Sequence, residues 1–407
     1  MQIELTYNNE PMNLNLPDRW TVDCFRQKTD DSALGYDHFV ESLEKSGNSE
    51  IFNTDSLLIV VNDAHRSTPT AQVLEWLTKW KPSLVGSADF LIACGTHKLP
   101  DESEKRKIFG ALFDSVSSRI TSHDCHKKEE MKLIGQDSNG HDCFVNKKLF
   151  EYKHIFLINS IEPHYFAGYT GGRKSIVPGL ADFETIERNH NLANSLECMP
   201  LRLQGNPMAE HLESIVANFN QDNIFTLQIV YDNKKRIKNF FFGSLKDAFQ
   251  AGVTHADEMY AVSIAGKYDA AILEILPPLD ANIYQAQKAL ENNQIAVADN
   301  GVAIILSACA DGIGSEFFFK LAESWDAELN RPKDGKLHFG SHKLARVNQI
   351  GKRITAGLCS LQPDEIVSKV FYKPIKNIQN CLEEKAKEKN NYRVAVVYDA
   401  AHTVLTI

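Results

Sequence analysis

Histidine and lysine side chains gather in one glycine-rich stretch, residues 162–190, with the sequence EPHYFAGYTGGRKSIVPGLADFETIERNH. The residues that could do chemistry there are His164, Lys174 and His190. Imidazole acts as a general acid or base near neutral pH and binds transition metals, and a lysine amine can act as a nucleophile. The glycines before Lys174 allow backbone turns closed to other residues and let a ligand approach the main chain. We therefore interpret this stretch as the candidate active centre.

Two more polar turns follow short apolar runs of the kind that form buried strands. The run LLIVV precedes a turn with Asp63 and Arg66, and the run FLIAC precedes a turn with His97. Residues 155–158 lead into the glycine-rich stretch in the same way. Open α/β sheets bind ligands at the carboxyl ends of their strands. If the strands are parallel, the side chains of all three turns lie along one edge of a sheet.

Apolar runs alternate with helical patterns along the chain, and 407 residues exceed a single ordinary core. The pattern predicts an α/β protein of two α/β domains with the active site in the cleft between them. Residues 1–264 would form the first domain, which carries Lys174 and the histidines. Residues 265–407 would form the second, with a strand at 302–306, helices from there to about residue 388, and a final strand at 392–398 whose tail could return to the first domain.

Composition limits the functional classes. The net charge of −9 argues against a general nucleic-acid binder, and no run approaches the roughly 18 apolar residues of a membrane span. The N-terminus lacks a signal-peptide pattern, and none of the eight cysteines forms a CxxC pair. We expect a cytoplasmic protein with buried thiols and neither a nucleic-acid nor a membrane partner.

The segment GYTGGRKS is similar to a phosphate-binding loop, but Arg173 occupies a position that the loop reserves for glycine. Glycine N–H groups with Arg173 could still hold a phosphate monoester, so Lys174 is either a nucleophile or a simple phosphate partner. Any one of the histidines alone is more often structural. Because three of them lie in segments that can share one edge of the sheet, the structural and functional interpretations carry equal weight here.

The sequence resembles the nickel-pincer lactate racemase family over essentially its whole length. The motifs that carry the resemblance occur in order as NDAHRSTPT (62–70), CGTHK (94–98), EPHYFAGYTGGRK (162–174), His190 and YQAQK (284–288). The resemblance implies an isomerase that inverts the α carbon of a 2-hydroxy acid by reversible hydride transfer. The hydride acceptor would be a nickel-pincer nucleotide, pyridinium-3,5-bisthiocarboxylic acid mononucleotide with nickel, bound covalently to Lys174.

The resemblance also implies roles for single residues. His190 would bind the nickel, and His97 and His164 would alternate as base and acid on the substrate hydroxyl. The other cofactor-binding residues implied are Asp63, Thr96, Gly171, Gly172 and Arg173. The substrate-binding residues implied are Arg66, Tyr284, Gln285 and Lys288.

The implied partners are a small 2-hydroxy acid and the cofactor-biosynthesis enzymes that mature the protein, with a homodimer as the candidate assembly. The substrate stays open among lactate, longer or aromatic 2-hydroxy acids, diacids and sugar acids. One alternative is a zinc- or iron-dependent lyase or hydrolase that uses the histidines. Another is a non-catalytic protein of the same fold that binds a hydroxy acid or a nucleotide.

Overall fold

The computed structural model describes residues 1–326, 340–387, 389 and 391–407, and the chain forms two compact α/β units. Unit 1 comprises Met1–Lys28, Ala193–Leu201 and Glu258–Ile407, and unit 2 comprises Thr29–Leu192 and Arg202–Asp257. The predicted fold class of parallel α/β sheets is confirmed. The units divide the chain differently from the predicted 1–264 and 265–407, because the first 28 residues pack with the C-terminal part.

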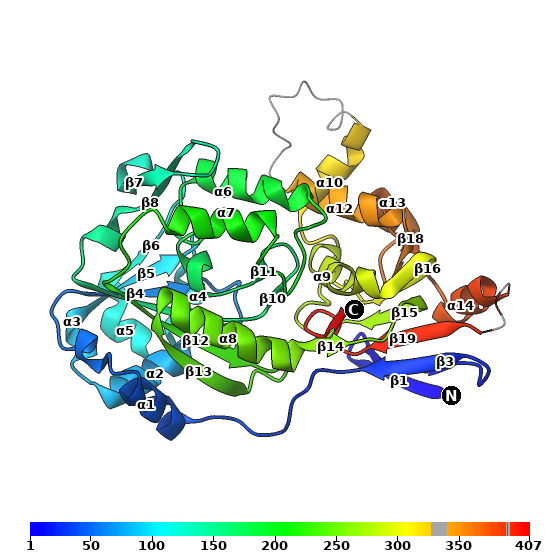
Figure 1. Ribbon diagram of the computed structural model, residues 1–407, viewed down its shortest axis with the longest axis horizontal. Coiled ribbons are helices and arrows are strands. Elements are labelled where there is room, and N and C mark those ends of the chain that lie inside the picture. Colours follow the sequence, from blue (N-terminus) through cyan, green and yellow to red (C-terminus); the bar gives the residue numbers. More distant parts are fainter. Residues whose placement is uncertain (327–339, 388, 390) are drawn as a thin grey trace. The chain divides into compact units, whose positions relative to one another are not determined.

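Unit 2 is built on a six-stranded sheet in the order β13-β12-β9-β4-β5-β6 (Figure 1). The strands are β13 (Ile237–Ser244), β12 (Ile224–Tyr231), β9 (His154–Ser160), β4 (Leu57–Asn62), β5 (Ala88–Ala93) and β6 (Ile120–Ser122). Every neighbouring pair is parallel except β12 and β13. The carboxyl ends of β9, β4 and β5 therefore lie at one edge, as the apolar runs predict.

Apolar helix faces cover one side of this sheet. The helices are α1 (Tyr36–Lys45), α2 (Thr70–Trp80) and α4 (Glu102–Phe109). In α2, Val73, Leu74 and Leu77 fall at helical spacing and are buried against the strands. The glycine-rich loop packs on the other side, where Ser175 hydrogen-bonds to Asn159 of β9. Around that loop lie α6 (Phe183–Asn191), α7 (Pro207–Val216) and α8 (Leu245–Tyr260).

Three local features complete unit 2 and its boundary. Pro69 is the N-cap of α2, and the Thr68 hydroxyl bonds to Asn62 and Ser160. Residues 122–143 contain strand β7 (Met131–Gln136) and the start of its antiparallel partner β8 (Asp142–Asn146). Helix α8 ends at Tyr260 and is followed by β14 (Ala261–Ser263).

Unit 1 has a second six-stranded sheet, in the order β18-β17-β16-β15-β19-β3, with all neighbours parallel. Its strands are β18 (Lys373–Pro374), β17 (Thr355–Cys359), β16 (Val297–Leu306), β15 (Tyr268–Glu274), β19 (Arg393–Val397) and β3 (Thr21–Phe25). The helices expected from residue 306 to about 388 are present in the described residues of that range, but the expectation missed β17, which lies inside the sheet. Residues 327–339 and 388 lie outside the described residues. Short β20 (Val404–Thr406) pairs with β14.

Both faces of this sheet are covered. One face packs against α9 (Ile283–Asn293), α10 (Glu316–Glu323), α12 (Ser341–Gly351) and α13 (Asp364–Lys369). The other packs against α14 (Ile378–Ala386) and the N-terminal hairpin of β1 (Gln2–Tyr7) and β2 (Glu10–Asn15). Among the described residues, no helix combines the length and apolar character that a membrane crossing requires.

Candidate active site

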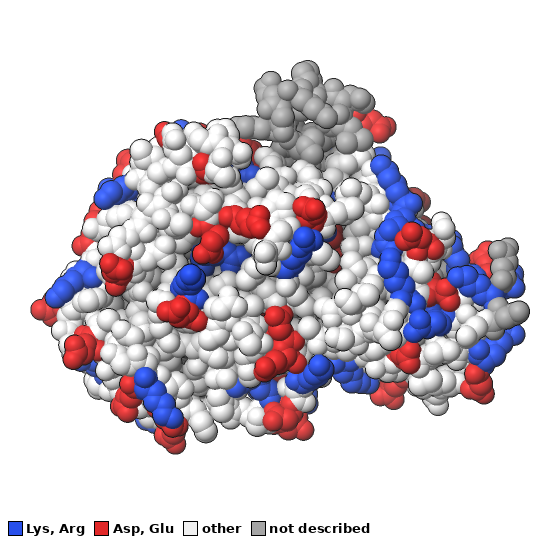
Figure 2. Space-filling view, viewed as in Figure 1, with Lys and Arg blue, Asp and Glu red and all other residues white. Residues whose placement is uncertain are grey.

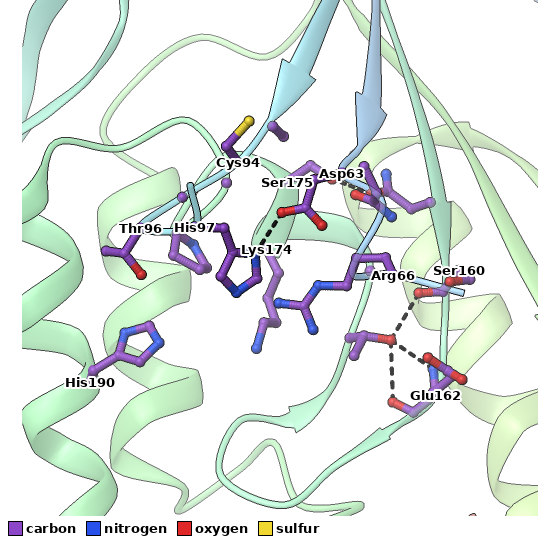
Figure 3. Close-up of a pocket in the computed structure, with 18 residues that line it drawn as sticks. Asp63, Arg66, Cys94, Thr96, His97, Ser160, Glu162, Lys174, Ser175 and His190 are labelled. Carbon is purple, nitrogen blue, oxygen red and sulfur yellow. Dashed lines mark hydrogen bonds and ion pairs between the residues drawn. The ribbon is translucent and has the colours of Figure 1, made fainter. Parts of the chain in front are cut away.

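A cavity of about 80 Å³ lies where β4, β5 and β9 end in unit 2. Seven residues proposed from the sequence line it, namely Asp63, Arg66, Thr96, His97, Gly171, Lys174 and His190. Figure 3 shows the Arg66 guanidinium and the Lys174 amine pointing into the same space, with the His190 ring facing that space from α6. Residues from three strand ends and one helix thus meet at one site, as the parallel topology requires.

Asp63 and His97 form a close pair across neighbouring strand ends. Oδ2 of Asp63 lies 2.6 Å from Nδ1 of His97, and Oδ1 accepts the backbone N–H of His65. Burial acts to raise the pKa of Asp63, but the hydrogen bond and charge of His97, aided by Arg66 and His65, lower it below its ordinary value. Asp63 is therefore a carboxylate that holds the proton of His97 on Nδ1 and leaves Nε2 as the basic nitrogen.

His164 is held in the opposite tautomer. It lies on β10 (Pro163–His164), which pairs with β11 (Gly168–Tyr169), and it is not among the residues that line the cavity. Its Nδ1 accepts the backbone N–H groups of Phe166 and Ala167 at 3.2 and 3.1 Å. The proton of a neutral His164 ring is then on Nε2. Nε2 of His164 is therefore a hydrogen-bond donor, whereas Nε2 of His97 is an acceptor.

Lys174 sits in a tight 3₁₀ turn, Gly172–Ser175. Its side chain is only 8% exposed although its amine faces the cavity. The turn depends on glycine at Gly171 and Gly172, whose φ angles are +78° and +52°. A Cβ at Gly171 would lie 2.6 Å from Oε1 of Gln228, and one at Gly172 would lie 2.5 Å from the Phe249 ring. Close packing therefore fixes the turn that presents Lys174.

His190 lies near the C-terminal end of α6, and its Nδ1 donates to the carbonyl of Ile186 at 2.9 Å. Burial lowers the pKa of His190 to about 4, and the charges of Lys174, Arg66 and His97 act in the same direction. The ring is therefore neutral at physiological pH, with its lone pair on Nε2. A neutral imidazole whose other nitrogen is fixed by a carbonyl is the usual form of a histidine metal ligand.

The helix that carries His190 is anchored by a buried polar network. Asn189 donates to the carbonyl of Met208 and bonds to Nδ1 of His211, and Nε2 of His211 meets Asp137 at 3.2 Å. Nε of Arg188 also reaches Asp137, at 3.3 Å. These contacts tie α6 to α7 and to the β7–β8 hairpin, and they fix the orientation of α6.

Arg173 does not line this cavity with its neighbour Lys174. Its side chain lies in a second cavity of unit 2, with the guanidinium 4.7 Å from the centre of the Phe249 ring. The cofactor role expected for Arg173 stays a prediction. Gly172 also lies outside the lining set, although its N–H donates to Oε1 of Gln228 at 2.9 Å.

Tyr284, Gln285 and Lys288 belong to α9 of unit 1. They are half-buried and lie within the first two turns of this helix. Asn282 caps this helix by accepting the backbone N–H of Gln285 at 3.0 Å. Lys343 donates to the carbonyl of Tyr284 at 2.8 Å and lies 3.3 Å from the centre of its ring. Their role in substrate binding stays a prediction.

Several polar residues of the site escaped the sequence analysis. Asn159 and Ser160 line the cavity from the end of β9, and Gln228 supports the glycine turn from within β12. The signal was present, since each is a polar side chain inside or at the end of an apolar run. Within the described ranges, no three or more His, Cys, Asp or Glu side chains gather in a metal-binding group.

Comparison with known proteins gives concordant matches. The lactate racemase N-terminal domain model matches residues 7–198, and the lactate racemase C-terminal domain model matches residues 276–405. Lactate racemase from Thermoanaerobacterium thermosaccharolyticum is 28% identical over 99% of both chains. Lactate racemase from Lactiplantibacillus plantarum is 28% identical over 81% of this chain and 75% of its own length.

Solved structures agree with these matches. The lactate racemase apoprotein from T. thermosaccharolyticum superposes with a TM-score of 0.87 at 26% identity over the full length of both chains. A protein from Thermotoga maritima shares the fold, with a TM-score of 0.70 at 17% identity over 92% of this chain and 98% of its own. The two family models together span most of both units, and the same fold recurs in a solved lactate racemase. The chain belongs to the lactate racemase family and is an isomerase.

Proposed function

We propose that this protein is a racemase or epimerase that inverts the α carbon of a 2-hydroxy acid with a nickel-pincer nucleotide tethered to Lys174. The observation that carries the proposal is the meeting of Lys174, His190 and the Asp63–His97 pair at one cavity, although they come from separate segments of the chain. Racemase activity agrees with the family, and the relatives named above act on lactate by their names.

The donor set of this cavity fits the proposed cofactor. Lys174 provides a primary amine for a covalent link, and His190 provides a neutral imidazole for a nickel ion, which accepts nitrogen ligands readily. The fit rests on these donors and not on the volume of about 80 Å³, which is smaller than a nucleotide. When bound, the group would supply a carbon that accepts a hydride from the substrate Cα and returns it to either face.

The residues of the chain would bind the substrate and move its hydroxyl proton. The Arg66 guanidinium, directed into the cavity, suits the carboxylate of a hydroxy acid. His97, kept by Asp63 in the tautomer with a basic Nε2, would take the hydroxyl proton. His164, which carries its proton on Nε2, would return a proton to the substrate oxygen from the side opposite His97. Tyr284, Gln285 and Lys288 are proposed to complete substrate orientation.

A labelling experiment tests the reaction class. An enantiopure 2-hydroxy acid with deuterium at Cα is incubated in ordinary water with cofactor-loaded protein. Hydride return predicts that the opposite enantiomer forms with the deuterium retained. Loss of the label to solvent at the rate of inversion would show that the α hydrogen leaves as a proton, which contradicts the proposal.

Metal and mass analysis test the cofactor separately. The matured protein should contain nickel at one per chain and a covalent adduct on Lys174. Zinc without an adduct would instead support the metal-dependent lyase or hydrolase, and an inert protein that only binds hydroxy acids would support the non-catalytic alternative. A screen of enantiopure lactate, aromatic, diacid and sugar-acid substrates then identifies the substrate.

A further inference from the structure

A second cavity in unit 2, of about 260 Å³, lies beside α7 and α8 and shares no lining residue with the first. Ala209 and Val216 of α7 and Leu245 and Phe249 at the start of α8 give it apolar walls. A cavity of roughly 150 Å³ with apolar walls is enough to bind benzene. The space is therefore large enough for an organic molecule with an apolar body.

A buried cation faces this space. Arg173 is 3% exposed, and its Nε and Nη1 atoms have no hydrogen-bond partner in the part of the chain that the structure describes. Nη2 reaches the carbonyl of Ala167 at 3.4 Å. Burial lowers the pKa of Arg173 to about 10, with a partial offset from Glu213, so the guanidinium is still charged at neutral pH. Buried donors left without acceptors are costly, and a bound anion would satisfy them.

The nearest protein carboxylate satisfies Arg173 poorly. Oε2 of Glu213 is 3.7 Å from Nε, beyond hydrogen-bonding distance, and the Glu213 side chain is 64% exposed. Its ion pair with Arg173 is therefore weak and readily displaced. Figure 2 shows acidic and basic side chains interspersed on the visible surface of unit 2. The cavity lining likewise includes a negative charge, at Glu210, and a positive charge, at Lys246. Such a rim suits a single negative charge better than a dianion.

We propose that the second cavity binds a small organic monocarboxylate, with its carboxylate on Arg173 and its apolar body against Leu245 and Phe249. A guanidinium matches the geometry of a carboxylate, and charge-assisted hydrogen bonds of this kind are the strong ones. The Phe249 ring already stacks against the guanidinium and continues into the apolar wall. The second cavity shares no lining residue with the first, so the proposal gives Arg173 a role apart from the cofactor role that the resemblance implies for it.

The test uses the full-length protein without cofactor, with benzoate as probe and benzamide as its uncharged analogue, measured by isothermal titration calorimetry. Benzoate should bind at one site per chain, and benzamide should bind at least about tenfold more weakly because it lacks the charge. Arg173→Met should weaken benzoate by at least about tenfold. Glu213→Gln should tighten it about two- to fivefold, because it removes the competing carboxylate.

Two further variants test which of the two cavities binds benzoate. Ala209→Leu fills the second cavity without a change of charge and should abolish benzoate binding, and Arg66→Met alters only the first cavity and should leave it intact. Loss of binding in Arg66→Met but not in Ala209→Leu would overturn the proposal. So would binding of inorganic phosphate in an Arg173-dependent manner with no binding of benzoate. If circular dichroism shows that Arg173→Met does not fold, the other two variants still test the proposal. Glu213→Gln should tighten benzoate binding, and Ala209→Leu should abolish it.

Discussion

Asp63 holds His97 by a 2.6 Å hydrogen bond between its buried carboxylate and Nδ1 of the ring. The two residues follow adjacent parallel strands, β4 and β5, so the pair depends on the register of the sheet. Because the carboxylate holds Nδ1 of a partly exposed ring, it fixes the orientation of that ring and leaves Nε2 without a proton. Asp63 is a positioning residue for the proposed proton transfer.

Asp63→Asn should therefore lower kcat by about 10²- to 10⁴-fold, because an amide can donate to Nδ1 and favour the wrong tautomer of His97. Cofactor content, measured by nickel analysis and mass spectrometry, should stay close to that of the unmodified protein. Asp114→Asn is the matched control, since the Asp114 side chain is 77% exposed and distant in sequence from the site. Equal activity of both variants would contradict the positioning role.

His97→Ala and His164→Ala should each retain nickel and lose most turnover, by about 10²- to 10⁴-fold, since each removes one proton-transfer group. Racemisation of each enantiomer, followed by chiral chromatography, measures the effect. His65→Ala is a graded control, because the His65 ring packs 4.8 Å from the His97 ring without a place in the proton transfer. Full activity in either of the first two variants would remove that histidine from the mechanism.

Lys174→Ala and Lys174→Arg should both lack a covalent adduct by intact-protein mass spectrometry, because neither offers a primary amine at the cavity. Circular dichroism should show a folded protein in both cases. Lys98→Ala, at an exposed lysine in the turn beside His97, should keep the adduct. An adduct that persists in Lys174→Arg would show that the cofactor is attached to another residue.

Gly172→Ala should destabilise the protein more than Gly140→Ala. Both glycines have positive φ angles, +52° and +80°, so both substitutions strain the backbone by about 1–2 kcal/mol. Only a Cβ at Gly172 meets another residue, the Phe249 ring at 2.5 Å, which adds about 1–3 kcal/mol. Urea unfolding compares the two, and equal losses would show that the Phe249 ring moves aside without cost.

The stability that Asp137 contributes should fall in acid. Burial raises its pKa, but the backbone N–H groups of His141 and Asn139 and the side chain of His211 lower it well below its ordinary value. A carboxyl with a depressed pKa in the folded state stabilises fully above its unfolded pKa of about 3.9, and this contribution is lost as the pH drops below that value.

The melting temperature of Asp137→Asn should accordingly lie below that of the unmodified protein at pH 7, and the two should converge towards pH 3. Asp142→Asn, in the neighbouring strand β8, removes an exposed carboxyl and is the matched control for the loss of one charge. A constant difference between pH 7 and pH 3 would mean that Asp137 acts through its shape and not its charge.

Continuous apolar runs made the main strands and the candidate centre predictable. Strands buried on both faces, such as β4 and β9, require these runs, and parallel order then brings their polar turns to one edge. Strand β17 carries only the short sequence TAGLC, too brief and too rich in small residues to be distinguished from a helix. The β7–β8 hairpin is charged and partly exposed, and its apolar residues come in runs of at most three, so it lacks the long continuous run that marks the other strands.

Side-chain direction was the other limit. A 3₁₀ turn rotates consecutive residues by about 120°, so Arg173 and Lys174 lie next to each other in sequence but face different cavities. The different directions of these two side chains can be deduced only once the geometry of the turn is known. Gln228 supports that turn from a strand more than 50 residues away, through a contact that no local pattern encodes.

The place of β3 at the edge of the unit 1 sheet has a consequence for synthesis on the ribosome. Among the described strands its one neighbour in that sheet is β19, so residues 21–25 are translated well before residues 393–397, with which they pair. The nascent chain must carry this strand without its partner while both segments of unit 2 emerge. The unit 1 sheet is therefore completed only after unit 2 has been synthesised, and a nascent chain that stops before residue 393 lacks the strand that pairs with β3.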